Sequence, residues 1–132
     1  MAKKITAISA YRPELKRMKT MQTRQVVEDI AGHTGLDEGE IRFVAYEMRD
    51  TIIFAHQRGQ AVKIDGFGTF TPIMRPDGTL DTVFRAAPEM RDLLRDKHKI
   101  SATILNRSSI GKSADELVAR WNAEHPDDPV EE

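Results

Sequence analysis

The chain has the length and composition of one globular domain with a small addition. It has 132 residues, of which 39% are hydrophobic and 31% are charged, which excludes a disordered chain. It holds no cysteine, which excludes disulfides and cysteine-ligated metals. Its apolar stretches are shorter than the roughly 18 residues of a membrane-spanning helix. The N-terminal stretch is also too short for a signal peptide, so we expect a cytoplasmic protein.

The net charge of −1 hides an uneven distribution along the chain. Residues 1–24 carry a net charge of +6, whereas residues 114–132 carry a net charge of −6. A basic segment is typical of proteins that bind nucleic acid. The two ends could equally pair with each other or only solubilise the chain, so charge alone leaves these alternatives open.

The first elements are a basic segment and a helix. Residues 1–20 are expected to form a basic arm or an added strand, because the run over 5–8 is β-prone. Apolar residues then recur at helical spacing from Val26 to Ile30, and glycines follow. This pattern predicts a first helix over about 21–33.

The second predicted helix has the clearest start in the chain. Asp37 is a good N-cap, and Glu40 three residues later completes a capping box. An apolar stripe follows, formed by Ile41, Val44, Met48, Ile52 and Ala55. Further apolar residues lie off this stripe, namely Phe43, Tyr46, Ile53 and Phe54. A helix that is apolar on more than one face needs two surfaces to pack against, and a second copy of the chain would supply one.

A hairpin is predicted after this helix. Residues 62–64 alternate between apolar and polar, as in a half-buried strand, and the glycines on both sides of Phe67 fit a tight turn or bulge. The next strand, over 69–74, should turn at Arg75-Pro76-Asp77-Gly78 and return over 82–85. Proline presets φ for such a turn and glycine accepts a positive φ.

The last third is predicted to contain two short helices. Pro88 opens the first, which should run from 89 to about 97 with Met90, Leu93 and Leu94 facing inward. Ser113 and Glu116 form a capping box before the second, which carries Trp121. This helix is expected to dock on the domain, although the Trp121 segment could also bind a protein partner. The tail from 125 onward is expected to be extended and solvated.

The sequence contains no complete motif for catalysis or cofactor binding. Gly111-Lys112-Ser113 is similar to the end of a phosphate-binding loop, but Asn106 stands where that motif requires glycine. Gly66 and Gly68 lack the third glycine of a dinucleotide fingerprint. The histidines show no metal-ligand spacing, and each is expected at the surface: His33, His56, His98 and His125. We therefore expect no enzyme activity, no cofactor and no metal.

The order of these elements matches a known family. Its most diagnostic stretch is residues 58–64 followed by Gly66-Phe67-Gly68-Thr69-Phe70, and residues 23–27 match its first helix. The second helix matches at Gly35, Leu36, Ile41, Ala45 and Ile52. On these residues, positions 21–97 resemble the HU and integration host factor family of bacterial histone-like proteins.

The resemblance implies an α+β fold: an HU-like intertwined dimer, with a helical base, a β-sheet saddle and β-arms. The HU-like domain would span 21–98, between the N-terminal segment 1–20 and a C-terminal extension over 99–132. In that family the arms enter the DNA minor groove, and a proline at the tip wedges between base pairs. The implied function is mostly sequence-independent binding of double-stranded DNA in the nucleoid, through the minor groove and phosphates.

The predicted arm departs from the family pattern. Only about a dozen residues separate Phe70 from Val83, and the tip lacks the family's long basic strand. Pro76 is either a plain turn residue or a reduced wedge, and Asp77 and Asp81 would repel phosphate. The chain thus resembles divergent, short-armed HU-like domains. The alternative function is an HU-fold dimerisation or protein-interaction module that has lost DNA binding.

The candidate site residues follow from this interpretation. Candidate DNA-binding residues are Arg24, Lys63, Arg75, Pro76, Arg85, Lys3 and Lys4. Candidate residues of the homodimer interface are Ile41, Val44, Met48, Ile52, Phe67 and Phe70. The basic residues over 3–24 could replace missing arm charge, and the acidic tail could compete with DNA for them.

Overall fold

The computed structural model describes residues 1–131. The chain divides into two compact units: a terminal unit built from both chain ends, Met1–Lys19 and Ser101–Glu132, and a central unit, Thr20–Ile100. In the part of the chain that is described, no helix has the length and apolar character required to cross a bilayer.

Two helices open the central unit, α2 (Thr23–Thr34) and α3 (Glu38–Gln57). The side chain of Asp37 accepts hydrogen bonds from the backbone N–H groups of Gly39 (2.7 Å) and Glu40 (3.4 Å), which confirms the predicted N-cap. The start of α2 has a capping box between Gln22 and Gln25, which the sequence analysis did not predict. Both predicted helices are therefore present, with small shifts of their ends.

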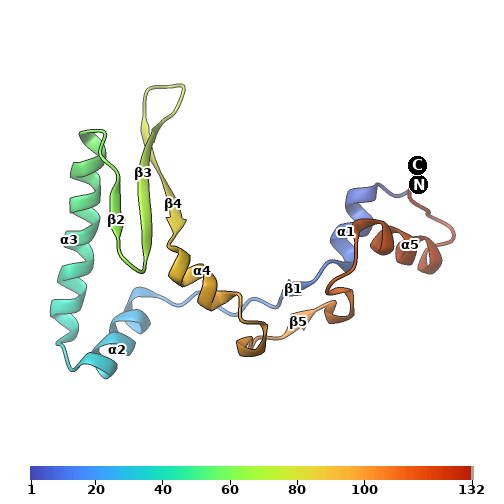
Figure 1. Cartoon of the computed structure of the whole chain (residues 1–132), viewed down its shortest axis with the longest axis horizontal. Coiled ribbons are helices and arrows are strands. Elements are labelled where there is room, and N and C mark those ends of the chain that lie inside the picture. Colours follow the sequence, from blue (N-terminus) through green and yellow to red (C-terminus); the bar gives the residue numbers. More distant parts are fainter. Residues whose placement is uncertain (132) are drawn as a thin grey trace. The chain divides into compact units, whose positions relative to one another are not determined.

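An antiparallel sheet follows, in the order β2 (Val62–Ile64), β3 (Gly68–Met74) and β4 (Leu80–Ala86) (Figure 1). The β3–β4 ladder runs from the pair Gly68–Ala86 to the pair Met74–Leu80. The turn closes with a hydrogen bond from the Gly78 N–H to the Arg75 carbonyl oxygen (2.9 Å), and Gly78 has a φ of 88°. The predicted turn chemistry is confirmed, and the hairpin is short.

The two faces of this sheet differ in character. The register places Val62, Phe70 and Phe84 on one face and Lys63, Thr69 and Arg85 on the other. On the first face the rings of Phe70 and Phe84 lie 4.8 Å apart, and Phe67 joins them at 5.5 Å from Phe84. We call the second face, with Lys63, Thr69 and Arg85, the open face.

His56 connects α3 to the aromatic side of the sheet. Its Nε2 lies 2.8 Å from the Thr82 hydroxyl and its Nδ1 lies 3.1 Å from the Gln60 carbonyl oxygen. The prediction of a surface position for His56 was wrong: the residue is buried, because both ring nitrogens find partners inside the fold.

After the sheet, α4 (Pro88–Leu94) is shorter than predicted, and a separate 3-10 turn, η1 (Lys97–Lys99), follows it. Leu93 and Leu94 are 72% and 73% exposed, so the prediction that they face inward was wrong for this chain alone. The helix has only two turns, and no side chain of the described residues covers this side of it.

The terminal unit contains α1 (Lys4–Tyr11), β1 (Glu14–Leu15), β5 (Ile104–Leu105), a 3-10 turn η2 (Arg107–Ser109) and α5 (Ala114–Glu124). Strands β1 and β5 pair antiparallel, and α1 packs against α5. The predicted arm or strand over 5–8 was therefore wrong, because that run is helical. Ala7 and Tyr11, one turn apart, are both buried, and this packing overrides the local β propensity.

The two chain ends lie side by side within this unit (Figure 1). The Ala2 N–H donates to the Pro129 carbonyl oxygen (2.9 Å), and Val130 is buried with Ala2 and Ala7 in a small core. The prediction of a solvated tail was wrong at Val130, which joins this core, whereas positions 126–128 and Glu131 are exposed as predicted. Glu132 lies outside the described residues.

Trp121 completes the packing of the terminal unit. The predicted start of α5 is confirmed by a hydrogen bond from the Glu116 N–H to the Ser113 hydroxyl (3.2 Å). The Trp121 ring meets Tyr11 edge-on at 6.2 Å, stacks on His125 at 3.8 Å and donates from Nε1 to the Asp128 carbonyl oxygen (2.8 Å). The tryptophan thus joins both ends of the chain.

Candidate functional site

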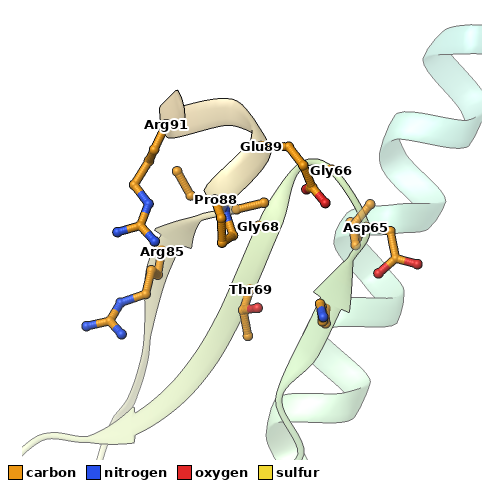
Figure 2. A pocket seen from close by; sticks show the side chains of 12 residues that line it. Asp65, Gly66, Gly68, Thr69, Arg85, Pro88, Glu89 and Arg91 are labelled. Atoms are coloured by element: carbon orange, nitrogen blue, oxygen red, sulfur yellow. The ribbon is translucent and has the colours of Figure 1, made fainter. Parts of the chain in front are cut away.

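The open face of the sheet brings together three of the basic side chains of the central unit. Lys63 on β2 and Arg85 on β4 both face Thr69 across the ladder, and Arg91 from α4 lines the same pocket of about 390 Å³ (Figure 2). All three cations are exposed, and none forms an ion pair within residues 1–131. Their charge is therefore available to a ligand.

Arg91 was not among the candidates of the sequence analysis. It lies one turn after Pro88, which starts α4 directly beyond the end of β4. One signal in the sequence could have identified Arg91. Arg85 lies near the end of a predicted strand, and Arg91 lies in the first turns of the helix that follows it. Its proximity to Lys63 depends on the strand register, which the sequence did not define.

The hairpin tip has the opposite electrostatic character. Arg75 forms an ion pair with Asp81, and Asp77 accepts hydrogen bonds from the hydroxyl (2.6 Å) and the N–H (3.0 Å) of Thr79. These Thr79 hydrogen bonds hold the pKa of Asp77 below its usual value. The Thr82 N–H and the Arg75 guanidinium similarly lower the pKa of Asp81. Both carboxylates are charged at neutral pH, so the tip carries no positive excess.

Pro76 lies in the exposed turn at this tip. It is the second residue of the turn that the Gly78–Arg75 hydrogen bond closes, the position where a fixed φ favours turn formation. The geometry thus accounts for Pro76 as a turn residue, and a wedging role stays a prediction.

The remaining basic candidates have acidic neighbours. Arg24 on α2 pairs with Glu28 at 3.0 Å, although it is largely exposed. Lys4 belongs to the terminal unit and lies 3.4 Å from Asp115, and the N-terminal amine lies 3.3 Å from Asp128. Of the two alternatives, pairing between the basic and acidic ends is therefore partly realised inside the terminal unit. Lys3 is exposed beside this pairing.

The predicted interface residues border two apolar grooves of the central unit. Val44 is 55% exposed and Met48 is 39% exposed. The first groove, between α2 and α3, is lined by Glu40 and six apolar residues, Ile30, Leu36, Ile41, Val44, Ala45 and Met48. The second, between α3 and β2, is lined mainly by Phe43, Val44, Met48, Ile52, Val62 and Ile64. Phe67 is exposed and Phe70 is half-buried, and both contact Phe84. A single chain therefore leaves the aromatic face of the sheet partly uncovered.

Comparison with known proteins identifies the family. A family model described as an HU domain fused to a winged helix-turn-helix, Ig or glycine-rich motif matches residues 3–87. Two solved structures are similar: HU from Thermotoga maritima and a point mutant of it. Each shares 19% identity and is matched over 100% of its own chain and 57% of this one, with TM-scores of 0.46 and 0.49. A search of curated proteins found no match. Because the family match spans well over half of the chain, this protein belongs to the HU-HIG family, within the HU group of bacterial histone-like DNA-binding proteins.

Proposed function

We propose that this chain is a homodimeric architectural protein that binds double-stranded DNA mostly without sequence preference. The observation that carries the proposal is the open face, where Lys63 and Arg85 point to the same side of an HU-type sheet and have no acidic partner within the described residues. Phosphate contacts of such cations are sequence-independent, and they weaken with added salt because binding releases counterions from the DNA. A chain with this activity would associate with the nucleoid.

The dimer is supported by the uncovered apolar surface of the central unit. Both grooves beside α3 are lined by large apolar side chains, and exposed apolar surface of this extent is typical of an interface. A second copy would cover the predicted interface residues on α3 together with Phe67 and Phe70. Two copies would also place two open faces on one assembly, which doubles the number of phosphate contacts.

The binding mode should differ from that of a long-armed HU protein. The β3–β4 hairpin is short, and its tip carries Arg75 neutralised by Asp81 beside the charged Asp77. A tip of this kind gains little from phosphate, and Pro76 can enter the minor groove only to a small depth. We therefore expect weak bending of DNA and an affinity for DNA that depends mainly on contacts with the open face of the sheet.

A gel-shift titration with a linear and a kinked duplex at low and physiological salt tests the proposal. We expect the dimer to bind both duplexes, with affinity that falls steeply with salt and differs little between the two. A dimer that binds neither duplex at low salt would contradict the DNA-binding function. That result would favour the alternative, a dimerisation or protein-interaction module with the HU fold.

One observation favours that alternative, namely the acidic character of the hairpin tip. The Trp121 segment is a weaker argument for a protein partner, because its ring is already occupied by Tyr11, His125 and the Asp128 backbone. We propose that Trp121 holds the terminal unit together. Architectural proteins of the HU family are not enzymes, and we propose no catalytic role.

A further inference from the structure

We propose that the pocket formed by Lys63, Arg85 and Arg91 holds one backbone phosphate of bound DNA, and that this pocket replaces the hairpin tip as the main phosphate contact. The inference rests on the proposed DNA-binding function and specifies where the contact is made. We call this pocket the phosphate pocket.

The geometry places the cations around one opening. The strand register aligns Lys63, Thr69 and Arg85 across the three strands, and Arg91 reaches the same opening from α4. Figure 2 shows the side chains of Arg85 and Arg91 near each other, on the side of the pocket away from Asp65. Guanidinium groups that line one pocket can each donate paired hydrogen bonds to phosphate oxygens. The Thr69 hydroxyl can add a further donor.

These three cations combine a shared pocket with freedom from ion pairs, whereas other unpaired cations of the central unit, such as Arg42 and Arg58, do not line that pocket. Lys63, Arg85 and Arg91 have no ion-pair partner within residues 1–131, whereas Arg24, Arg75 and Arg95 each pair with a carboxylate close to them in the sequence. A phosphate that approaches Arg75 must compete with Asp81 for the guanidinium, whereas the pocket cations are unpaired and outnumber the two carboxylates, Asp65 and Glu89, that line the pocket with them. The larger gain is therefore in the pocket.

The net charge of the pocket selects the form of phosphate. Asp65 and Glu89 also line it, so three cations face two carboxylates. A net charge of about +1 matches the single negative charge of a phosphodiester better than the higher charge of free inorganic phosphate. Lys63, Arg85 and Arg91 are all exposed, so a polymer can reach the pocket. DNA backbone, and not a free anion, is the matching ligand.

Arg91 and Arg95 provide a matched pair of variants for the test. Arg91 lies in the middle of α4 and Arg95 follows its last residue, but only Arg91 lines the pocket, and Arg95 lies 4.0 Å from Asp92. Duplex affinity is measured by fluorescence anisotropy over a range of salt concentrations for the full chain. Arg91→Gln should weaken binding about tenfold, and the salt slope should fall by about 0.9 for each phosphate that the variant no longer neutralises.

The controls separate a local contact from net charge and from misfolding. Arg95→Gln and Arg75→Gln should change affinity less than about twofold. Arg91→Lys should keep the salt slope, because it keeps the charge, but should recover only part of the affinity, because an ammonium cannot form the paired hydrogen bonds. Equal losses of affinity in Arg91→Gln and Arg95→Gln, or an unchanged salt slope in Arg91→Gln, would overturn the assignment. If the unaltered protein binds no duplex, the proposed function itself fails. If the unaltered protein binds and Arg91→Gln binds equally well, only the assignment of the phosphate pocket fails.

Inorganic phosphate separates the two sources of the ligand. Replacing chloride by phosphate at matched ionic strength should leave DNA affinity of the unaltered protein within about twofold. A phosphate-specific loss of DNA binding that disappears in Arg91→Gln would assign the pocket to a free anion and overturn the proposal.

Discussion

The terminal unit has a small apolar core and the central unit has none among the described residues, although both units expose large apolar side chains, such as Ile5 and Met18 in the terminal unit. In the terminal unit, Ala2, Ala7 and Val130 form a closed core, against which Val118 and Trp121 pack. The central unit is larger, yet Phe43 and Phe54 on α3 are 64% and 63% exposed. Its buried apolar residues are only Val27, Ala55 and Ala87 among those described.

This difference indicates two sources of stability in one chain. Each unit must offset its own conformational entropy by burial of apolar surface. The terminal unit achieves this with contacts between the two ends of the chain, such as the Ala2–Pro129 hydrogen bond and the Tyr11–Trp121 contact. The central unit lacks a comparable core, so its stability should depend on association and hence on protein concentration.

The largest expected effect comes from a charge in the apolar groove of α3. Val44→Glu would place an unpaired carboxylate in the proposed interface of both copies, at a cost of about 4 kcal/mol or more. We expect loss of the dimer in sedimentation and loss of helical circular dichroism. Trp121, the single tryptophan of the chain, should report a terminal unit that is still folded.

Gln57→Glu is the matched control for that variant, because it adds the same charge at an exposed position near the end of α3. It should leave the dimer intact. If Val44→Glu sediments and unfolds like the unaltered chain, the groove is not an interface and the contrast between the units has another cause.

Trp121→Ala should have the converse effect on the terminal unit. The ring is partly exposed, so we expect a loss of about 2–3 kcal/mol, less than the ~3–5 kcal/mol typical of a fully buried tryptophan. Protease digestion should release the two chain ends while the central unit still dimerises and binds DNA. Loss of DNA binding together with the terminal fold would show that the units are coupled and would contradict the comparison.

A pair of glycines tests the packing of the central unit itself. A Cβ at Gly68 would lie 2.5 Å from the Arg85 carbonyl oxygen and would also clash with the Phe84 ring, so Gly68→Ala should destabilise the unit by about 2 kcal/mol. Gly32 within α2 has open space around it, and Gly32→Ala should stabilise the unit by about 0.5–1 kcal/mol. Urea denaturation followed by circular dichroism measures both. Equal effects of the two substitutions would exclude the close approach at Gly68.

The smallest expected effect is a pH dependence of the terminal unit. The Tyr11 hydroxyl and Arg120 Nε donate hydrogen bonds to Glu124, and these lower the pKa of its carboxyl. Because the folded-state pKa lies below the unfolded value of about 4.5, this stabilisation is present above that pH. It is lost as pH falls through the folded-state value.

Urea denaturation followed by Trp121 fluorescence at a series of pH values should show this loss. Glu124→Gln keeps an acceptor for Tyr11 without a titrating carboxyl and should flatten the dependence. The same slope in both proteins would assign the acid sensitivity to other carboxyl groups.

The sequence predicted those parts of the fold that local signals determine. Asp37 marked the start of α3, and Pro76 with Gly78 marked the turn of the hairpin, because a cap and a turn depend on only a few consecutive residues. Helix α1 was missed because its residues prefer strands locally, and only contact with α5, about a hundred residues away, makes them helical.

The candidate site was predicted only in part, because some of its residues are brought together by contacts that are distant in the sequence. Lys63 and Arg85 were identified from their strands, but Arg91 depends on how α4 leaves β4. The neutralisation of Arg75 by Asp81 and of Lys4 by Asp115 depends on pairings across a hairpin and across the whole chain. The sequence indicated that Asp77 and Asp81 oppose phosphate and left pairing of the chain ends open, but only the fold shows which charges are partners.

Sedimentation equilibrium of the whole chain at micromolar concentration tests the central claim most directly, with circular dichroism on the same samples. If the central unit needs a second copy to cover α3, the protein should sediment as a dimer, and its helical signal should weaken as dilution dissociates it. A monomer that keeps its full helical signal on dilution would contradict the account.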